Sequence, residues 1–162
     1  APIFVARQLV KHKFMPWNEV SRRYVDDEPE FYLPEVYRKK ADNVKQGSSC
    51  ESVEILRHHD HVTGETWAAF VGNSVQLNSE YCLRLYKDML EAGICPEQAR
   101  MVLPQSMYTE WYWSGSLDAF ANMCKLRCKP DTQEETRLIA NQISEQMLEK
   151  FPVSWSELTK WK

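Results

Sequence analysis

The sequence predicts a helix-rich α+β fold that forms a single domain with a small antiparallel sheet. Three observations lead to this prediction. The 162 residues are enough for one hydrophobic core, most apolar residues recur at the three- and four-residue steps of helices, and only two or three short stretches have the β-branched and aromatic composition of strands. Because no internal repeat divides the chain, we expect one domain over residues 1–162.

The N-terminal segment is expected to be a helix followed by extended chain. Pro2 suits the first turn of a helix, and the apolar face that follows it continues to His12. Pro16 prevents a continuous helix through this region because it lacks an amide donor. The alternation of side chains over residues 20–25 then predicts a strand or an extended edge.

The middle of the chain combines a polar stretch with a long helix. Residues 39–66 are polar and are expected to form an exposed insertion loop, with a hairpin around Thr63 and Gly64. Apolar residues then recur at helical spacing over residues 67–92, after which Gly93 gives a C-terminal stop. This second pattern predicts one long helix.

The C-terminal half is expected to alternate short and long elements. Ser114 or Ser116 can cap the helix that ends at Arg127, and Thr132 with Glu135 has the spacing of a capping box for the helix that follows. The expected elements are a short helix over residues 97–103, a strand over 107–113, a helix over 117–127, a long helix after residue 132 and a short last helix around Trp155.

The composition indicates a soluble protein of a reducing compartment such as the cytoplasm. No apolar run is long enough to cross a bilayer, and the five cysteines show neither a CxxC pair nor an even number for disulfide pairing. Cys124 and Cys128 stand one helical turn apart and three histidines crowd residues 58–61, but the spacing of a zinc site is absent. We therefore expect buried thiols, a solvated histidine loop and no metal.

A charged stretch at residues 11–24, KHKFMPWNEVSRRY, is the strongest candidate for a binding site. Its cations surround one acid, Glu19, and one hydroxyl, Ser21. A solvated basic face is the alternative, because basic residues beside a helix end usually face water. The interleaved polar and aromatic residues instead favour a site for a phosphorylated ring compound. The cations are Lys11, His12, Lys13, Arg22 and Arg23, and the aromatic residues are Phe14, Trp17 and Tyr24.

These residues resemble the flavin-dependent thymidylate synthases, whose signature is Arg-His-Arg, seven residues and then Ser, preceded by a helix close to APIFVARQ and followed by Arg-Tyr. In this chain residues 11–13, Ser21 and residues 23–24 stand at those positions. The resemblance resumes over residues 93–127, and the two blocks together cover roughly half of the chain. It implies a fold like that of the thymidylate synthase-complementing proteins. Since that family has a sheet segment ahead of this helix, we expect the chain to lack that segment.

The resemblance implies conversion of dUMP to dTMP, with methylenetetrahydrofolate as the carbon donor, NADPH as the reductant and FAD as the cofactor. This route needs no cysteine nucleophile. Family members are homotetramers whose active sites are shared between subunits. We therefore expect self-association, and neither nucleic acid nor membrane as a partner.

The dUMP site implied by the resemblance is rich in arginine. A planar guanidinium meets phosphate oxygens in pairs, so Arg23 and Arg100, together with the Ser21 hydroxyl, are expected at the phosphate. Arg127 is the implied catalytic residue, because a guanidinium beside the pyrimidine ring favours its ionised form. The full set implied for dUMP is Gln8, Lys11, Glu19, Ser21, Arg22, Arg23, Arg100 and Arg127.

The FAD site implied by the resemblance combines cations and polar side chains from both blocks. His12 is expected near the isoalloxazine ring. Lys11 and Lys13 replace the two arginines of the signature, which keeps the charge but loses the bidentate geometry. Asp118 reverses a charge where many relatives carry Asn-x-Arg. The full set implied for FAD is Lys11, His12, Lys13, Glu19, Ser116, Asp118 and Asn122.

Two alternatives stay open on the sequence alone. The first is a dUMP hydroxymethylase of the same fold, which would stop before the final reduction. The second is a non-catalytic nucleotide-binding or nucleic-acid-binding module that uses the same cations for phosphate. Nucleic-acid binding usually needs a broad positive surface, and a net charge of −3 with an acidic run over residues 26–30 weighs against it.

Overall fold

The computed structural model describes residues 1–24, 27–42 and 47–160 and confirms the helix-rich α+β fold. Within these residues the strands occur as three separate antiparallel pairs, and no helix is long and apolar enough to cross a membrane. The elements are α1 (Ile3–Leu9), β1 (Trp17–Glu19), β2 (Arg38–Lys40), β3 (Ser48–Ser52), β4 (Ile55–His59), β5 (Thr66–Phe70), α2 (Val71–Glu91), α3 (Pro96–Ala99), the 3-10 turn η1 (Arg100–Val102), β6 (Trp111–Trp113), α4 (Leu117–Arg127), α5 (Glu134–Lys150) and α6 (Pro152–Thr159).

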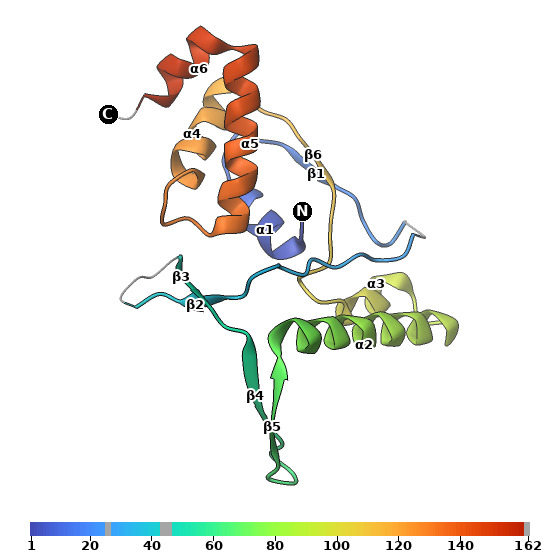
Figure 1. The fold of residues 1–162 in the computed structure, drawn as a ribbon. Helices are drawn as coiled ribbons and strands as arrows, with labels where there is room; N and C mark the ends of the chain where they lie inside the picture. The colour runs from blue at the N-terminus through green and yellow to red at the C-terminus, as the bar shows by residue number, and fades with distance from the viewer. Residues whose placement is uncertain (25–26, 43–46, 161–162) are drawn as a thin grey trace.

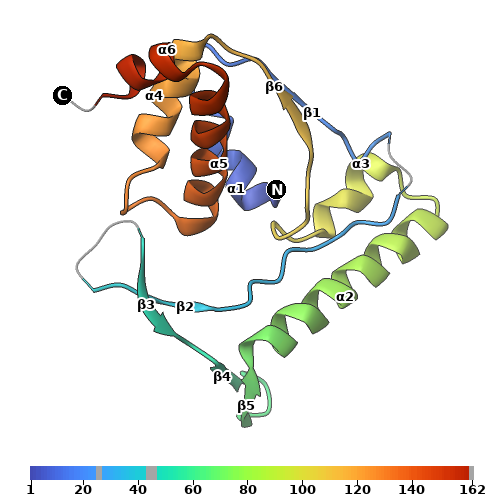
Figure 2. The same cartoon turned by 45° about the horizontal axis from the view of Figure 1, so that its top comes forward.

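The helices form two groups that are joined by long extended segments. Figure 1 shows α4, α5 and α6 packed together with α1 against α5, while α2 and α3 lie apart from them. The β4–β5 hairpin projects from the N-terminal end of α2, away from the helices. Strands β1 and β6 run side by side between the two groups (Figure 2). This pairing brings the middle of the charged stretch beside the chain that leads into α4.

The hydrophobic core holds α1 against α4, α5 and α6. Val5 and Leu9 of α1 are buried with Met123 of α4 and Trp155 of α6. The indole Nε1 of Trp155 donates a hydrogen bond to Ser144 Oγ at 3.1 Å, so the polar atom of this buried ring has a partner. Because α1 leads directly into the charged stretch, this core fixes the position of the first candidate residues.

Helix α4 has the bounds that its local signals predict. Ser116 is the N-cap, and its Oγ accepts a hydrogen bond from Ala119 N at 3.1 Å. The helix ends at Arg127 after 11 residues. At the usual rise of a helix, Ser116 and Arg127 are therefore separated by roughly 16 Å.

Two expected elements are placed differently by the structure, and a third, the strand expected over residues 107–113, is present only as β6 at Trp111–Trp113. The strand expected over residues 20–25 is wrong, because the strand is β1 at Trp17–Glu19, where β6 provides a pairing partner; Val25 lies outside the described residues. The helix expected over residues 67–92 begins only at Val71, because Thr66–Phe70 pairs with β4 instead. In both cases hydrogen bonding to a distant strand, rather than the local pattern, decides the boundary.

The polar stretch at residues 39–66 contains regular structure. It contributes to two antiparallel pairs, β2 with β3 and β4 with β5. The hairpin expected around Thr63 and Gly64 is confirmed. Gly64 has a φ of +77°, and Asp60 Oδ1 accepts hydrogen bonds from the amides of Val62 at 2.7 Å and Thr63 at 3.0 Å. The Asp side chain therefore stabilises the tip of the hairpin.

The capping box expected at Thr132 and Glu135 is wrong. Helix α5 begins at Glu134, and Thr132 Oγ1 donates to the carbonyl of Leu126 at 3.2 Å. The Glu135 carboxylate accepts a hydrogen bond from Arg38 of β2, whereas the amide of Thr132, the donor that a capping box would use, donates to the carbonyl of Lys129. Both partners of this bond between Arg38 and Glu135 are charged, which makes it strong, and Glu135 thereby joins α5 to a segment far away in the sequence.

The C-terminal stop at Gly93 is confirmed and gives a stability prediction. Gly93 follows α2 with a φ of +84°, its amide donates to the carbonyl of Leu90 at 2.9 Å, and a Cβ there would meet no atom within 4 Å. Gly93→Ala should therefore destabilise the protein by about 1 kcal/mol through the backbone alone. Gly72→Ala inside α2, where the Cβ would lie an ordinary 3.9 Å from Tyr37, should not destabilise it. Urea denaturation measures both, and equal losses would contradict the prediction.

Candidate active site

Four of the candidate residues line one cavity of about 1060 Å³, which we name the Arg100 cavity. Helix α1, the chain that follows β1, the η1 turn and the segment before β6 form its walls. The lining mixes apolar atoms with charged side chains of both signs. The four candidates in it are Glu19, Ser21, Arg22 and Arg100.

Glu19 is fixed at the edge of the Arg100 cavity by two hydrogen bonds. Its Oε1 accepts from Thr109 Oγ1 at 2.8 Å, and its Oε2 accepts from Trp17 Nε1 at 3.1 Å. Glu19 is the last residue of β1 and pairs with Trp111 of β6, which places Thr109 within reach. The carboxylate therefore has a defined orientation before any ligand binds.

The predicted phosphate residues converge around Glu97. Arg100 Nε donates to the carbonyl of Glu97 at 3.4 Å, and Arg23 Nη1 lies 3.7 Å from the Glu97 carboxylate. Arg23 Nε also donates to Ser21 Oγ at 3.1 Å. Arg23 does not line the Arg100 cavity, whereas Arg22 does. One chain thus brings Ser21, Arg23 and Arg100 together, with Arg22 as an additional cation in the cavity wall.

A second cavity of about 620 Å³, which we name the Arg127 cavity, contains the predicted catalytic arginine. Arg127 Nη2 donates to the main-chain carbonyl of Gln8 at 2.8 Å, and its Nε donates to His12 Nε2 at 3.0 Å. The side chain of Gln8 donates in turn to Gln133. Lys11 and Gln8 line the cavity beside Arg127, and Arg7 lines both cavities. The end of α1 therefore connects the two.

The bond from Arg127 requires His12 to be neutral, because Nε2 can accept a hydrogen bond only without its own proton. Burial lowers the pKa of His12, and the positive charge of Arg127 lowers it further. Burial also lowers the pKa of Arg127. A neutral imidazole thus holds the guanidinium without competing for the negative charge of a ligand.

This arrangement predicts a pH dependence of stability. The pKa of folded His12 lies below the ordinary value of about 6.5, so the unfolded chain binds this proton more tightly. The free energy of unfolding should therefore be fully retained above about pH 7 and fall as the pH decreases through the folded pKa of His12. His12→Gln should remove this part of the slope in denaturation measured between pH 5 and 8. The same slope in both proteins would contradict the prediction, since the other histidines are common to both.

Lys13 and three candidates at the start and middle of α4 are not brought into either cavity. Ser116 Oγ is used as the helix cap, and Asn122 Nδ2 donates to Asp118 Oδ2 at 3.0 Å on the exposed surface. They lie on the N-terminal part of α4, whereas Arg127 is its last residue. Lys13 is exposed and lines neither cavity. Within one described chain these four residues are therefore separate from the Arg127 cavity.

Sequence reasoning missed several residues that line the Arg127 cavity. Arg38 comes from β2, and no local signal connects it with the start of α5, which is 97 residues away. Gln133 and Glu135 stand in a segment whose pattern indicates a helix cap. A search for polar side chains at the start of a helix that its cap does not need could have found these two residues, but not Arg38. The missed lining residues are Arg7, Arg38, Ser48, Gln133 and Glu135.

Cys124, on the same helix as Arg127, is not a nucleophile at neutral pH. Burial raises the pKa of the Cys124 thiol to about 12, so the thiolate that would attack a substrate is not formed. Cys124 packs in the core of α4, and its Sγ lies 3.5 Å from the carbonyl of Ala140. Among the described residues, no group of three or more His, Cys, Asp or Glu side chains could hold a metal ion.

Comparisons with known proteins identify the family of this chain. Residues 1–153 match the model of the family described as "Thymidylate synthase complementing protein". A flavin-dependent thymidylate synthase of Thermus thermophilus is 38% identical over 161 residues, which cover 96% of this chain and 53% of that protein. The enzyme of the same name from Thermosipho africanus is 32% identical, and the match covers 66% of its length. The chain thus spans between about half and two thirds of the length of these relatives.

A solved structure has the same fold. The UMP/dUMP methylase PolB from Streptomyces cacaoi, bound with 5-Br dUMP, superimposes with a TM-score of 0.76 at 26% identity, over 98% of this chain and 67% of that one. Its complex with 5-Br UMP gives a TM-score of 0.79 at 27% identity. The match of the family model to nearly the whole chain agrees with this likeness in fold. The chain therefore belongs to the thymidylate synthase complementing protein family, and the curated relatives that it matches are named flavin-dependent thymidylate synthases.

Proposed function

We propose that this chain carries the nucleotide site of a flavin-dependent thymidylate synthase, which converts dUMP to dTMP with methylenetetrahydrofolate as the carbon donor, NADPH as the reductant and FAD as the cofactor. One observation carries the proposal. The half-buried guanidinium of Arg127 is held by the Gln8 carbonyl and by His12 in a cavity whose charged side chains are mostly cations. Such a preorganised donor suits a ring that gains negative charge.

The nucleotide would occupy both cavities. Its pyrimidine ring belongs beside Arg127, whose fixed guanidinium can donate to the ring and favour its ionised form. Its phosphate belongs beside Ser21, Arg22 and Arg100, with Arg23 adjoining. Arg7 lines both cavities, which supports a single ligand that spans them. Glu19, held by two donors, would orient the ligand without moving itself.

The donor set also fits a flavin cofactor. Lys11 and Lys13 are exposed cations on either side of His12, and they suit the diphosphate of FAD. The His12 ring lies 6.4 Å from the Trp113 ring, centroid to centroid, so flat surface adjoins these cations. FAD would supply hydride chemistry when bound. The residues of this chain would hold it, with Glu19, Ser116, Asp118 and Asn122 completing the set.

Shared sites in a homotetramer are part of the proposal. Ser116, Asp118 and Asn122 line neither cavity of their own chain, as a site completed by another subunit would require. Helix α2 supports self-association, since Leu77 and Tyr81 are one turn apart and 64% and 60% exposed. Light scattering should give four times the mass of one chain. A monomer would contradict this part of the proposal.

The proposed activity is tested with purified protein, FAD, dUMP, methylenetetrahydrofolate and NADPH. We expect the flavin absorption bands to co-elute with the protein and to change when dUMP is added. We also expect dTMP to accumulate. Hydroxymethyl-dUMP as the product would instead support the hydroxymethylase alternative. If the protein instead forms no complex with dUMP but binds DNA with an affinity that weakens as salt is added, a nucleic-acid-binding module would be supported.

A further inference from the structure

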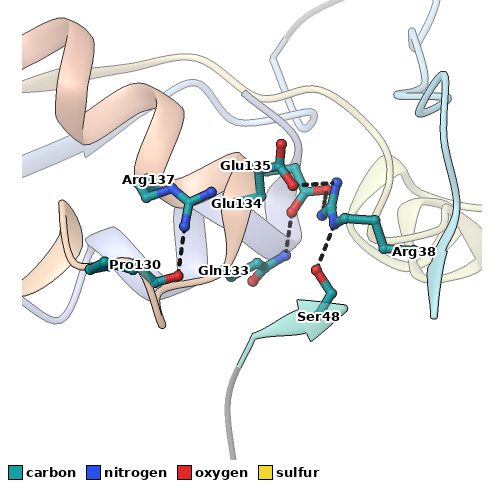
Figure 3. Close-up of polar contacts among 7 residues, drawn as sticks. All are labelled: Arg38, Ser48, Pro130, Gln133, Glu134, Glu135 and Arg137. Atoms are coloured by element: carbon teal, nitrogen blue, oxygen red, sulfur yellow. Dashed lines mark hydrogen bonds and ion pairs between the residues drawn. The ribbon is translucent and has the colours of Figure 1, made fainter. Parts of the chain in front are cut away.

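Arg38 lies at the centre of an ion-pair network that joins β2, β3 and the start of α5 (Figure 3). Its Nε donates to Ser48 Oγ at 2.8 Å, its Nη1 lies 3.1 Å from Glu134 Oε2, and its Nη2 donates to Glu135 Oε1 at 2.5 Å. The side chains of Arg38 and Glu135 are only 23% and 13% exposed. A pair this well shielded from water interacts more strongly than a surface pair.

The network continues from Glu135 to Arg127 through two glutamines. The second oxygen of Glu135 accepts from Gln133 Nε2 at 3.1 Å, and Gln133 Oε1 accepts from the side chain of Gln8. The main-chain carbonyl of Gln8 accepts from Arg127 Nη2 at 2.8 Å. Arg38, Gln133 and Glu135 also line the Arg127 cavity. The network therefore reaches the same space that the Arg127 guanidinium faces.

Within the described part of the chain, Glu135 is the only carboxylate that lines the Arg127 cavity. Burial alone would raise the pKa of Glu135, but the hydrogen bonds from Arg38, from the backbone and from Gln133, with the charge of Arg38, outweigh it and lower the pKa. The side chain is therefore negatively charged at neutral pH. Without Arg38, this carboxylate would be available to pair with the remaining cations of the cavity, which are Arg7, Lys11 and Arg127.

We propose that Arg38 is a positioning residue, which holds the carboxylate of Glu135 so that the guanidinium of Arg127 stays free for the nucleotide. The inference rests on the proposed function, in which dUMP is the ligand of this cavity. Released from Arg38, Glu135 would act as a competing anion inside the site, and Gln133 would lose the partner that fixes it against Gln8. Arg38 thus acts through Glu135 and does not itself have to touch the nucleotide.

The test measures the affinity of the purified protein for dUMP by calorimetry. Thermal unfolding of the same samples checks that each variant is folded. Arg38→Gln should weaken dUMP binding by about tenfold, the order expected when a charged hydrogen-bond partner is lost and its acceptor is left unpaired. Glu135→Gln alone should bind dUMP at least as tightly as the unsubstituted protein. The double variant Arg38→Gln with Glu135→Gln should recover most of the lost affinity, because the competing charge is gone.

Recovery in the double variant separates positioning from a merely structural role. If Arg38 only tied β2 to α5, the double variant would bind dUMP as weakly as Arg38→Gln, and this result would overturn the inference. Unchanged affinity in Arg38→Gln would overturn it as well. Arg38→Lys, which keeps a cation beside Glu135, provides a milder variant if Arg38→Gln unfolds, and it should weaken binding less than tenfold.

Two matched controls use the same helix. Glu134→Gln removes the other acidic partner of Arg38, but Glu134 does not line the Arg127 cavity, so dUMP affinity should not change. Arg137→Gln removes a cation that donates to the carbonyl of Pro130 at 2.6 Å outside the cavity (Figure 3), and it should also have no effect. Failure of the unsubstituted protein to bind dUMP would refute the proposed function, and this inference with it. If the unsubstituted protein binds dUMP but the variants do not change its affinity as expected, only this inference is refuted.

Discussion

Arg127→Ala is expected to lower the rate of dTMP formation by at least about 100-fold while the protein keeps its fold. The guanidinium is fixed by the Gln8 carbonyl and by His12, so it needs no reorganisation when charge develops on the pyrimidine. Donors of this kind are worth several kilocalories per mole in a site that excludes water. The loss should appear in kcat more than in KM, because the interaction is strongest in the transition state.

Two variants make this measurement specific. Arg127→Lys keeps the positive charge but loses the planar fork, so its rate should lie between those of Arg127→Ala and the unsubstituted enzyme. Arg137→Ala removes an arginine that lines neither cavity, and it should leave the rate unchanged. Circular dichroism checks that each variant is folded. A rate for Arg127→Ala equal to that of Arg137→Ala would remove Arg127 from the catalytic role.

Arg100→Ala is expected to weaken dUMP binding by about 2 kcal/mol, or about thirtyfold, as for a lost charge-assisted bond to phosphate. Arg100 lines its cavity from the η1 turn, which follows α3 directly. Its Nε makes a long 3.4 Å bond to the carbonyl of Glu97, and such a bond is weak. The side chain can therefore turn to a ligand at little cost.

The control for Arg100 is Arg84→Ala on the exposed surface of α2, which removes the same charge away from both cavities. Calorimetry with dUMP compares the two. Equal affinities would mean that the phosphate binds elsewhere. Deoxyuridine lacks the phosphate, so it should bind the unsubstituted protein and Arg100→Ala with nearly the same affinity if Arg100 acts on the phosphate.

The site itself was only partly accessible to sequence reasoning. Arg127 and His12 were both named from the signature blocks, but their direct hydrogen bond spans 115 residues and follows only from the core that α1 and α4 share. Arg38 had no signal at all, because its partners on α5 lie in a different element. Glu135 had a signal that indicates a cap, and the structure uses this side chain for a distant ion pair instead.

The sequence by itself determined the features that depend on near neighbours in the chain. These are a serine cap for α4, expected at Ser114 or Ser116 and found at Ser116, the end of α2 before Gly93, the hairpin at Gly64 and the helix-rich class of the fold. Such features follow from a residue's own dihedral preferences and from bonds to residues a few positions away.

Only the tertiary structure decided where β1 and β5 lie and which side chains surround Arg127. Strand boundaries depend on a partner strand, and β1 finds its partner in β6, almost a hundred residues later. The walls of the Arg127 cavity come from α1, β2, β3, α4 and the start of α5. Long-range pairing is set by how the whole chain packs, and no local pattern contains that information.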